Sequence, residues 1–269
     1  AFGFDTGVLK GILKGPKGSP GLTQVTDTRT GAERARSPGL FSLYRIFDRT
    51  TRYEDARARD SESKLLADGA VEYRWPADER NPYELRAVYR WADEQSLDLE
   101  IRVTARQDLP DCEVFLSTYL EGTDHSYGFA RDDPDRFVEV LESQGTYHLF
   151  PRDAEARAIA LDGRWKREPH PVDWFLQPRF AAALGLRREA RSGATSLVMA
   201  PPDDCFAVSM PYGTEPHQSL YLSLLGRTIR AGQSATARAR LVLGGTISDE
   251  EALELYQAYL GELQIENRD

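Results

Sequence analysis

The sequence is poor in the residues on which most metal and redox sites depend. Two cysteines and four histidines occur among 269 residues, and they show none of the paired ligand spacings typical of zinc sites. Two cysteines are too few for a disulfide framework, although Cys112 and Cys205 could form one bridge if their strands lie side by side. We therefore expect no zinc site.

Net positive charge and long apolar runs are also missing. The formal charge is −9, which argues against a nucleic-acid partner because that affinity comes from counterions released by Lys and Arg. No stretch approaches the roughly 18 unbroken apolar residues of a membrane helix, so we expect no membrane partner. With 41% apolar residues, the chain is too hydrophobic for disorder, which predicts a soluble globular protein.

Motifs of three large enzyme classes are absent. The chain has no Gly-x-Ser-x-Gly elbow, no phosphate-binding loop and no Gly-x-Gly-x-x-Gly after a strand. These absences weigh against elbow-type hydrolases, NTPases and dinucleotide-dependent enzymes.

The chain starts at Ala1 without a methionine. Such a start fits a mature protein after signal cleavage as well as a shortened chain. We expect export, to the periplasm or out of the cell, and the sequence leaves the oligomeric state open.

Alternation of apolar and polar residues is the strongest positive signal. Val71, Tyr73 and Trp75 alternate with polar neighbours, and the same period continues through residues 85–91 and 97–103. A period of two is typical of half-buried strands. These segments predict an antiparallel meander with one face in water.

Further apolar runs extend this pattern along the chain. They predict strands at residues 39–45, 113–120, 145–150, 156–161, 196–200, 207–210, 219–224 and 235–243. The polar stretch 121–135 is interpreted as a long loop. Near the end, Ser248 and Glu251 form a capping box, and apolar residues then recur at helical spacing. No repeat or linker interrupts the strands, so we predict one domain over residues 1–269: an all-β fold, a large antiparallel β-sandwich with a short C-terminal helix.

In these features the chain resembles the galactose-mutarotase-like supersandwich family. The resemblance is carried by residues 6–11, 21–22 and 27–31, by the meander of residues 71–103, and by residues 219–243. Such domains occur in aldose epimerases, in polysaccharide lyases and as accessory domains of glycoside hydrolases. The resemblance therefore implies a carbohydrate ligand, whether a mono-, oligo- or polysaccharide. The chain lacks the Asn-His-x-x-Phe context and the late Glu motif of the family's epimerases, so candidate acids and bases are sought elsewhere.

The segment Met210–Gln218 is the first candidate site. This loop is bracketed by Pro and Gly and contains Tyr212, Glu215 and His217. Acid and base chemistry on a sugar needs a donor and an acceptor that titrate near neutral pH, and we assign these three residues to catalysis. The alternative is a polar surface loop whose prolines set the strand ends.

A second candidate group surrounds the strand at residues 145–150. His148 lies on it, and Arg152 and Asp153 follow a strand-breaking proline. An Arg beside a carboxylate often fixes a hydroxyl-rich or anionic ligand through forked hydrogen bonds. We assign His148 and Arg152 to catalysis and Asp153 to substrate binding; a structural ion pair is the alternative.

Two tryptophans form the third group. Trp165 follows the pair Asp162-Gly163, a hairpin signal, and Trp174 lies in a proline-rich run. An exposed indole offers a flat surface to the C–H face of a sugar ring, so we assign both to substrate binding. Ordinary packing in the core is the alternative.

The fourth group lies in the polar stretch 121–135. We assign His125 and Tyr127 to substrate binding. The aspartates of residues 132–135 begin to supply the oxygens that calcium needs, but no Asp-x-Asp-x-Asp-Gly loop is present. We therefore expect no cofactor, with calcium as the alternative.

Two functions of different classes fit this sequence. One is an enzyme in which an acid and a base move protons on a sugar, by epimerisation or β-elimination. The other is a non-catalytic carbohydrate-binding or structural module in which the tryptophans form a stacking platform. The sequence leaves both open.

Overall fold

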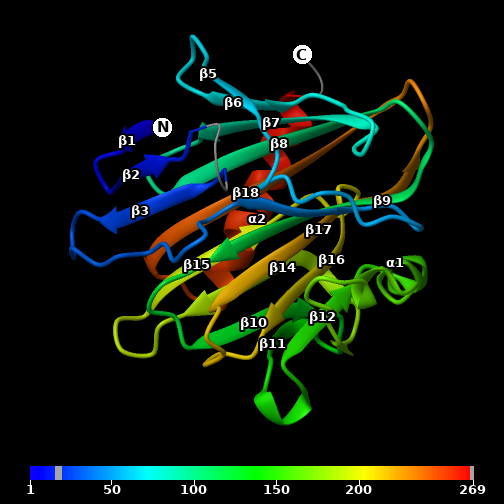
Figure 1. The fold of residues 1–269 in the computed structure, drawn as a ribbon. Helices are drawn as coiled ribbons and strands as arrows, with labels where there is room; N and C mark the ends of the chain where they lie inside the picture. The colour runs from blue at the N-terminus through cyan, green and yellow to red at the C-terminus, as the bar shows by residue number, and fades with distance from the viewer. Residues whose placement is uncertain (16–19, 267–269) are drawn as a thin grey trace.

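Strands dominate the computed structural model. Residues 1–15 and 20–266, which the structure describes, form three β-sheets (Figure 1). The smallest contains β1 (Phe2–Asp5), β2 (Leu9–Leu13) and β3 (Leu22–Asp27). The largest has the order β11 (Arg136–Glu139), β10 (His125–Ala130), β14 (Phe180–Arg188), β15 (Ala194–Met199), β18 (Ser234–Thr246), β8 (Ser96–Ala105), β7 (Tyr83–Trp91), β6 (Val71–Trp75) and β5 (Glu62–Leu65). The third has the order β13 (Trp174–Leu176), β12 (Tyr147–Pro151), β16 (Cys205–Pro211), β17 (Ser219–Ile229), β9 (Leu109–Tyr119) and β4 (Ser42–Phe47).

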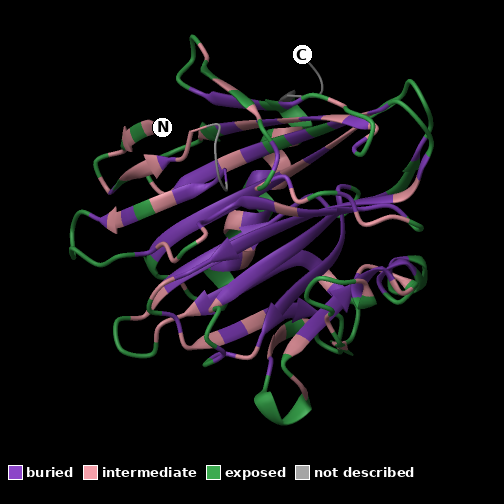
Figure 2. Ribbon diagram, viewed as in Figure 1, coloured by how far each residue is buried: buried purple, intermediate pink, exposed green. Residues whose placement is uncertain are grey.

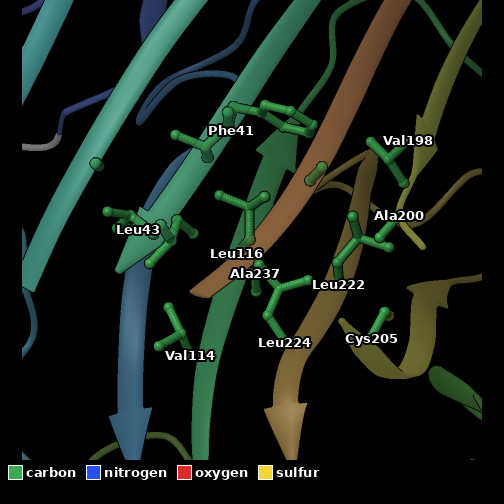
Figure 3. Packing of buried hydrophobic residues seen from close by; sticks show 14 of the residues in the cluster. Phe41, Leu43, Val114, Leu116, Val198, Ala200, Cys205, Leu222, Leu224 and Ala237 are labelled. Carbon is green, nitrogen blue, oxygen red and sulfur yellow. The ribbon is translucent and has the colours of Figure 1, made fainter. Parts of the chain in front are cut away.

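The core lies between the nine-stranded and six-stranded sheets. Alternation turns Val114 and Leu116 of β9 inward, together with Leu222 and Leu224 of β17, and they lie in one layer with Ala237 of β18 (Figure 3). The same apolar cluster includes residues of the three-stranded sheet. Figure 2 shows that most residues in the strands of the two large sheets are buried, while the exposed residues lie mainly in the loops. The predicted antiparallel sandwich is confirmed, and the parallel pair of β12 with β13 is an edge exception.

The outer face of the nine-stranded sheet is covered by helix α2 (Asp249–Glu266). Tyr256 and Tyr259 of α2 pack against Leu184 and Leu197 of the sheet. The helix begins with the predicted capping box, in which the Ser248 amide donates to Glu251 Oε2 at 2.7 Å and the Glu251 amide donates to Ser248 Oγ at 3.1 Å. In the described part of the chain, no helix combines the length and the apolar character needed to cross a bilayer.

The outer face of the six-stranded sheet has a different cover. The short helix α1 (Ala154–Ala160) packs there with Leu149 and Ala207, and the 3₁₀ turns η1 (Glu142–Gln144) and η2 (Arg164–Lys166) lie in the connecting segments before and after β12 and α1. Short irregular segments leave part of this face open to solvent, and the candidate site lies there.

The strand predicted at residues 156–161 is wrong, because the chain forms α1 at this point. The Asp153 side chain caps the helix by accepting from the Ala156 amide at 2.8 Å. Ala156, Ile159 and Ala160 then share one buried face at helical spacing. A run of only six residues is too short for its apolar pattern to distinguish a strand from a helix.

The loop predicted at residues 121–135 is also wrong in part, because it contains β10. On this strand Tyr127 and Phe129 face α2, whereas the inward positions are Ser126 and Gly128. A Cβ on Gly128 would lie 2.6 Å from the Phe150 ring. The inward positions Ser126 and Gly128 therefore carry small residues instead of large apolar ones, so the sequence of β10 does not show the usual alternation of apolar and polar residues.

The predicted hairpin at Asp162-Gly163 does not form either. Gly163 has a φ of 95° and leads from α1 into η2, a left-handed turn that favours glycine.

Cys112 and Cys205 are free and buried. They lie on β9 and β16 with β17 between them, so their strands are not neighbours and the bridge left open by the sequence is not made.

Candidate functional site

A cleft of about 290 Å³ opens on the outer face of the six-stranded sheet. We call it the aromatic cleft, because ring side chains from five strands and from the segments between them line most of it. It is lined by Tyr44, Arg45, Phe115, Tyr119, Tyr147, Trp165, His170, Pro171, Val172, Trp174, His217 and Tyr221.

The floor of the cleft follows from strand alternation. Phe115 and Tyr119 of β9 and Tyr221 of β17 point outward, since the alternate residues Val114, Leu116, Leu220 and Leu222 point into the core. The Phe115 and Tyr221 rings lie 4.9 Å apart between centroids, and Tyr119 lies 6.3 Å from Tyr221. Trp165 packs edge-on against Phe115 at 4.6 Å. The floor is therefore a continuous aromatic surface.

The loop that carries Trp165 is attached to the floor by a buried charge network. Arg164 Nη1 donates to Glu113 Oε2 at 3.2 Å, and Arg164 also contacts Asp162 at 2.9 Å. Ser223 donates to the other oxygen of Glu113 at 2.8 Å. Burial raises the pKa of Glu113, and the Arg164 guanidinium opposes that rise. Because Arg164 and Glu113 are both fully buried, each depends on the other for its charge balance.

Glu215 and His217 form a pair at the rim of the cleft, on the loop between β16 and β17. Glu215 Oε1 lies 2.7 Å from His217 Nδ1, and its Oε2 accepts from the His217 amide at 2.8 Å. The Glu215 side chain is 7% exposed and that of His217 is 56% exposed. The carboxylate is thus shielded while the imidazole is open to solvent.

Two contacts hold this loop in place. The buried Arg187 of β14 donates to the Gly213 carbonyl and to Thr123 Oγ1, the latter at 2.9 Å. Gly213 packs so closely on the residue before β10 that a Cβ there would lie 2.0 Å from the Asp124 carbonyl oxygen. Burial lowers the pKa of Arg187 to about 10.

A phenol faces the pair from the neighbouring strand β12. Tyr147 Oη lies 3.5 Å from His217 Nδ1, at the outer limit of a hydrogen bond. Burial, reinforced by the negative charge of Glu215, raises the pKa of Tyr147 to about 12. Tyr147 therefore stays a neutral hydroxyl that can donate a proton in a hydrogen bond.

Indole and guanidinium groups complete the lining. The Nε1 atoms of Trp165 and Trp174 have no hydrogen-bond partner among the described residues. The guanidinium carbon of Arg45 lies 5.0 Å from the Trp165 ring centroid and 4.8 Å from that of Tyr44. Donors therefore lie beside aromatic faces, an arrangement suited to a ligand with both hydroxyl groups and apolar C–H faces.

Four of the residues predicted from sequence meet in or beside this cleft: Glu215, His217, Trp165 and Trp174. Trp165 is itself buried, so it forms a wall of the cleft and not an exposed platform. Tyr212 lies on the same loop as Glu215, where its amide donates to the Thr146 carbonyl at 3.2 Å, but it does not line the cleft.

His148 does not converge with Glu215 and His217. It follows Tyr147, which lines the cleft, so alternation directs His148 to the other face of β12, where it is fully buried. Its Nε2 lies 3.0 Å from the Gly145 carbonyl oxygen, and its Nδ1 lies 3.0 Å from Gln177 Nε2. Burial lowers the pKa of His148. Both ring nitrogens are occupied by structural contacts.

Arg152 and Asp153 also lie outside the cleft. Arg152 Nε donates to Asp153 Oδ2 at 2.7 Å, while the other Asp153 oxygen caps α1. The pKa of Asp153 is lowered by the Ala156 amide and by Arg152, although burial works against this. The structural ion pair considered as the alternative describes this arrangement.

His125 and Tyr127 lie on the opposite side of the sandwich. Tyr127 packs against the cluster beneath α2, and His125 Nδ1 lies 2.6 Å from Glu139 Oε1. In the nearby turn, Asp132 pairs with Arg136 at 2.7 Å and Asp135 pairs with Arg131 at 2.8 Å. Within residues 1–15 and 20–266, no group of three acidic, His or Cys side chains is arranged to hold a metal ion.

Sequence reasoning missed several cleft residues that lie on segments it placed correctly. Tyr119 and Tyr221 occupy outward positions of strands predicted at 113–120 and 219–224, and Tyr44 and Arg45 end the strand predicted at 39–45. The sequence does carry a signal for them: strand alternation places these aromatic residues on the solvent side, where a large apolar ring indicates a binding surface.

A larger hollow of about 670 Å³ lies between α2 and the turn at residues 93–96. Its titratable lining consists of carboxylates such as Glu251 and Glu254. The aromatic cleft is the better candidate, because it brings imidazole, phenol and guanidinium groups together.

No protein-family model matches the chain, and no curated protein matches it by sequence. Solved structures do match. The α-N-acetylgalactosaminidase NagBb from Bifidobacterium bifidum, in its GalNAc complex, aligns with 97% of this chain at a TM-score of 0.59 and 12% identity. A protein in glycosyl hydrolase family 38 from Enterococcus faecalis aligns with 96% at a TM-score of 0.55 and 10% identity.

A third match is a protein from Escherichia coli K12 proposed to be an aldose 1-epimerase, with a TM-score of 0.47 and 11% identity over 91% of this chain and 98% of its own. This chain spans only 39% of the NagBb chain and 32% of the family 38 protein. At such identities the likeness concerns the fold alone. The shared fold agrees with the large β-sandwich that the resemblance to the galactose-mutarotase-like family implies.

Proposed function

We propose that the aromatic cleft binds a carbohydrate and that His217 moves a proton on it, in an epimerase- or lyase-like reaction. The observation that carries the proposal is the Glu215–His217 pair at the rim of the cleft. Two structural neighbours bear the names of glycoside hydrolases, and one of them was solved with GalNAc, which supports a carbohydrate ligand for this fold.

The pair has the chemistry of an oriented acid and base. An ionised Glu215 accepts from the Nδ1–H of His217, which leaves Nε2 as the basic nitrogen. The same carboxylate stabilises the imidazolium that forms once Nε2 has taken a proton. His217 can then return the proton, so one residue serves as base and acid in turn.

The rest of the cleft supplies binding. Tyr147 is a neutral phenol that can donate to a sugar hydroxyl, because its pKa is raised to about 12. The rings of Tyr119 and Trp174 offer flat surfaces for the C–H faces of a sugar. A volume of about 290 Å³ is at the small end for ligand pockets, which favours one sugar ring inside the cleft.

A matched pair of variants tests the catalytic role. His217→Ala removes the proposed base, whereas His125→Ala removes an imidazole that also contacts a carboxylate but lies on the opposite face. We expect His217→Ala to lower turnover about 10²- to 10⁴-fold and His125→Ala to leave it unchanged. Anomer interconversion of aldoses is followed by polarimetry, and β-elimination of uronides by the absorbance of the unsaturated product.

The proposal is wrong if His217→Ala keeps the wild-type rate on every sugar that the wild type converts. Equal losses in both variants would also contradict it, because they would indicate a general effect on folding. Circular dichroism and the melting temperature of each variant separate the two cases.

A non-catalytic carbohydrate-binding module is the second candidate. The observation that favours it is the lining of the aromatic cleft, in which the rings of Phe115, Tyr119 and Trp174 offer surfaces for binding rather than groups that move protons. In this case the wild type binds sugars without converting any of them, and Trp174→Ala weakens binding while His217→Ala has no effect on any rate. Calorimetric titration of the wild type with the same sugars, beside the rate measurements, distinguishes the two functions.

A further inference from the structure

A second hollow adjoins the aromatic cleft. It has a volume of about 430 Å³, and we call it the side hollow. Four residues line both the side hollow and the cleft: Tyr147, Pro171, Val172 and Trp174. The larger hollow between α2 and residues 93–96 shares no lining residue with the cleft. A ligand that extends out of the cleft would therefore continue into the side hollow.

The pairing of β12 with β13 produces this arrangement. The two strands run parallel, with Tyr147 opposite Trp174 in the register. Residues 144–146 and 171–173, which lead into these strands, therefore meet at the same edge of the six-stranded sheet. The Trp174 ring lies edge-on to Tyr147 at 6.2 Å and edge-on to Trp165, inside the cleft, at 5.1 Å. The indole of Trp174 thus belongs to the wall that the two hollows share.

The lining of the side hollow has the chemistry that a sugar unit needs. Phe175 is 39% exposed, and Gln144 and Thr146 are exposed as well. Gln144 Oε1 accepts from Gln177 Nε2 at 3.3 Å, but within the described residues the Gln144 amide nitrogen and the Thr146 hydroxyl have no hydrogen-bond partner. Free amide and hydroxyl groups beside an exposed aromatic residue can bind the hydroxyl groups and the C–H surface of a pyranose.

We propose that the aromatic cleft and the side hollow together bind an oligosaccharide of at least two sugar units, with the second unit in the side hollow. The inference rests on the proposed function, because it specifies the length of the carbohydrate that the same cleft takes. The cleft alone, at about 290 Å³, is at the small end for ligand pockets, whereas the two hollows together lie well within the usual range. A glycosidic bond holds consecutive units side by side, so the second unit needs a surface that adjoins the first.

Matched sugars of one and two units test this directly. We would titrate the protein calorimetrically with glucose, maltose and cellobiose, and with galactose, lactose and melibiose. At least one disaccharide should bind about tenfold more tightly than either of its monosaccharides, the effect of one or two additional net hydrogen bonds.

Two variants locate the second unit. Thr146→Trp fills the side hollow and should bring the disaccharide and monosaccharide affinities together. Gln144→Ala combined with Thr146→Ala removes the two free polar groups at exposed positions, so it should fold normally and reduce the preference to about threefold or less. Thr228→Trp is the matched control, an exposed threonine of β17 that lines neither hollow, and it should leave the preference intact.

Each other outcome contradicts a defined statement. Monosaccharides that bind as tightly as every disaccharide overturn this inference but leave the proposed function standing. A disaccharide preference that survives in both side-hollow variants, or that is lost equally in Thr228→Trp, also overturns it, because the second unit would then lie elsewhere. Failure of all six sugars to bind overturns the proposed function and this inference with it.

Discussion

The Arg164 guanidinium contacts the Glu113 carboxylate at 3.2 Å between Nη1 and Oε2, and neither side chain is exposed to solvent. This contact joins the segment that carries Trp165 to strand β9, which also contributes Phe115 and Tyr119 to the aromatic cleft. A buried ion pair seldom adds much net stability, but removal of one partner leaves an uncompensated buried charge. The contact therefore makes the wall of the cleft dependent on a single arginine.

We predict that Arg164→Met lowers the free energy of unfolding by about 3–5 kcal/mol. The loss should grow as the pH rises, because burial raises the pKa of Glu113 and the folded variant favours its protonated form. Urea denaturation at pH 5 and pH 8 measures both effects. The double variant Glu113→Gln with Arg164→Met, which removes both charges, should recover part of the loss; a double variant less stable than the single one would contradict this explanation.

Sequence patterns predicted the elements whose two faces differ strongly. The meander from Val71 to Val103 and the strand at residues 235–243 were found because apolar residues alternate there with charged ones. The capping box of Ser248 and Glu251 marked the start of α2, because its two hydrogen bonds depend only on residues three positions apart. Local chemistry of this kind can be recognised without knowledge of the fold.

The strands that were missed lack this contrast. On β14, Gly185 and Arg187 occupy inward positions, so the face toward the core shows no apolar series. Gly185 is needed there because Val208 and Met210 of the opposite sheet approach to 3.0 and 3.2 Å of where a Cβ would lie. Gly185 and Arg187 are explained only by how the two sheets pack together, and the sequence of a single strand does not reveal that packing.

The same limit applies to the candidate site. Glu215 and His217 were found together because they are two residues apart in one loop. Tyr44, Tyr119 and Tyr221 come from strands that are distant in sequence and adjacent in the sheet, so their convergence depends on the strand order β17-β9-β4. His148 was grouped with the site on residue type alone, although strand alternation places it on the other face from Tyr147.

The buried carboxyl of Asp27 should make the free energy of unfolding depend on pH in the acid range. The pKa of this buried carboxyl is lowered, chiefly by the hydrogen bond from Arg29, whose Nη2 lies 2.8 Å away. A depressed folded pKa contributes stability above the unfolded value of about 3.9, and that contribution is lost as the pH falls through the folded pKa.

We therefore expect Asp27→Asn to cost about 1–2 kcal/mol at pH 7 and progressively less below about pH 4. Thermal unfolding from pH 7 down to pH 3 measures the trend. Asp5→Asn makes the same charge change at an exposed carboxylate of the same sheet and serves as the control. A difference between wild type and Asp27→Asn that stays constant over this range would disprove the assignment.

Gly213 should couple the loop of Glu215 and His217 to the rest of the fold. A Cβ at this position would lie 2.0 Å from the Asp124 carbonyl oxygen, and a backbone atom cannot yield as the end of a side chain can. Gly213→Ala must therefore displace the loop, at a cost of about 1–3 kcal/mol in stability. Because the Gly213 carbonyl accepts from Arg187, the displacement also disturbs the contact that holds the loop.

The expected result for Gly213→Ala is a lower melting temperature together with weaker sugar binding in the cleft. Gly245→Ala is the matched control, since nothing lies within 4 Å of a Cβ at that position and its backbone is not left-handed. Gly245→Ala should change the free energy of unfolding by at most about 1 kcal/mol and leave sugar binding intact. Should Gly213→Ala lose stability but bind sugars as the wild type does, the position of this loop would not control binding in the cleft.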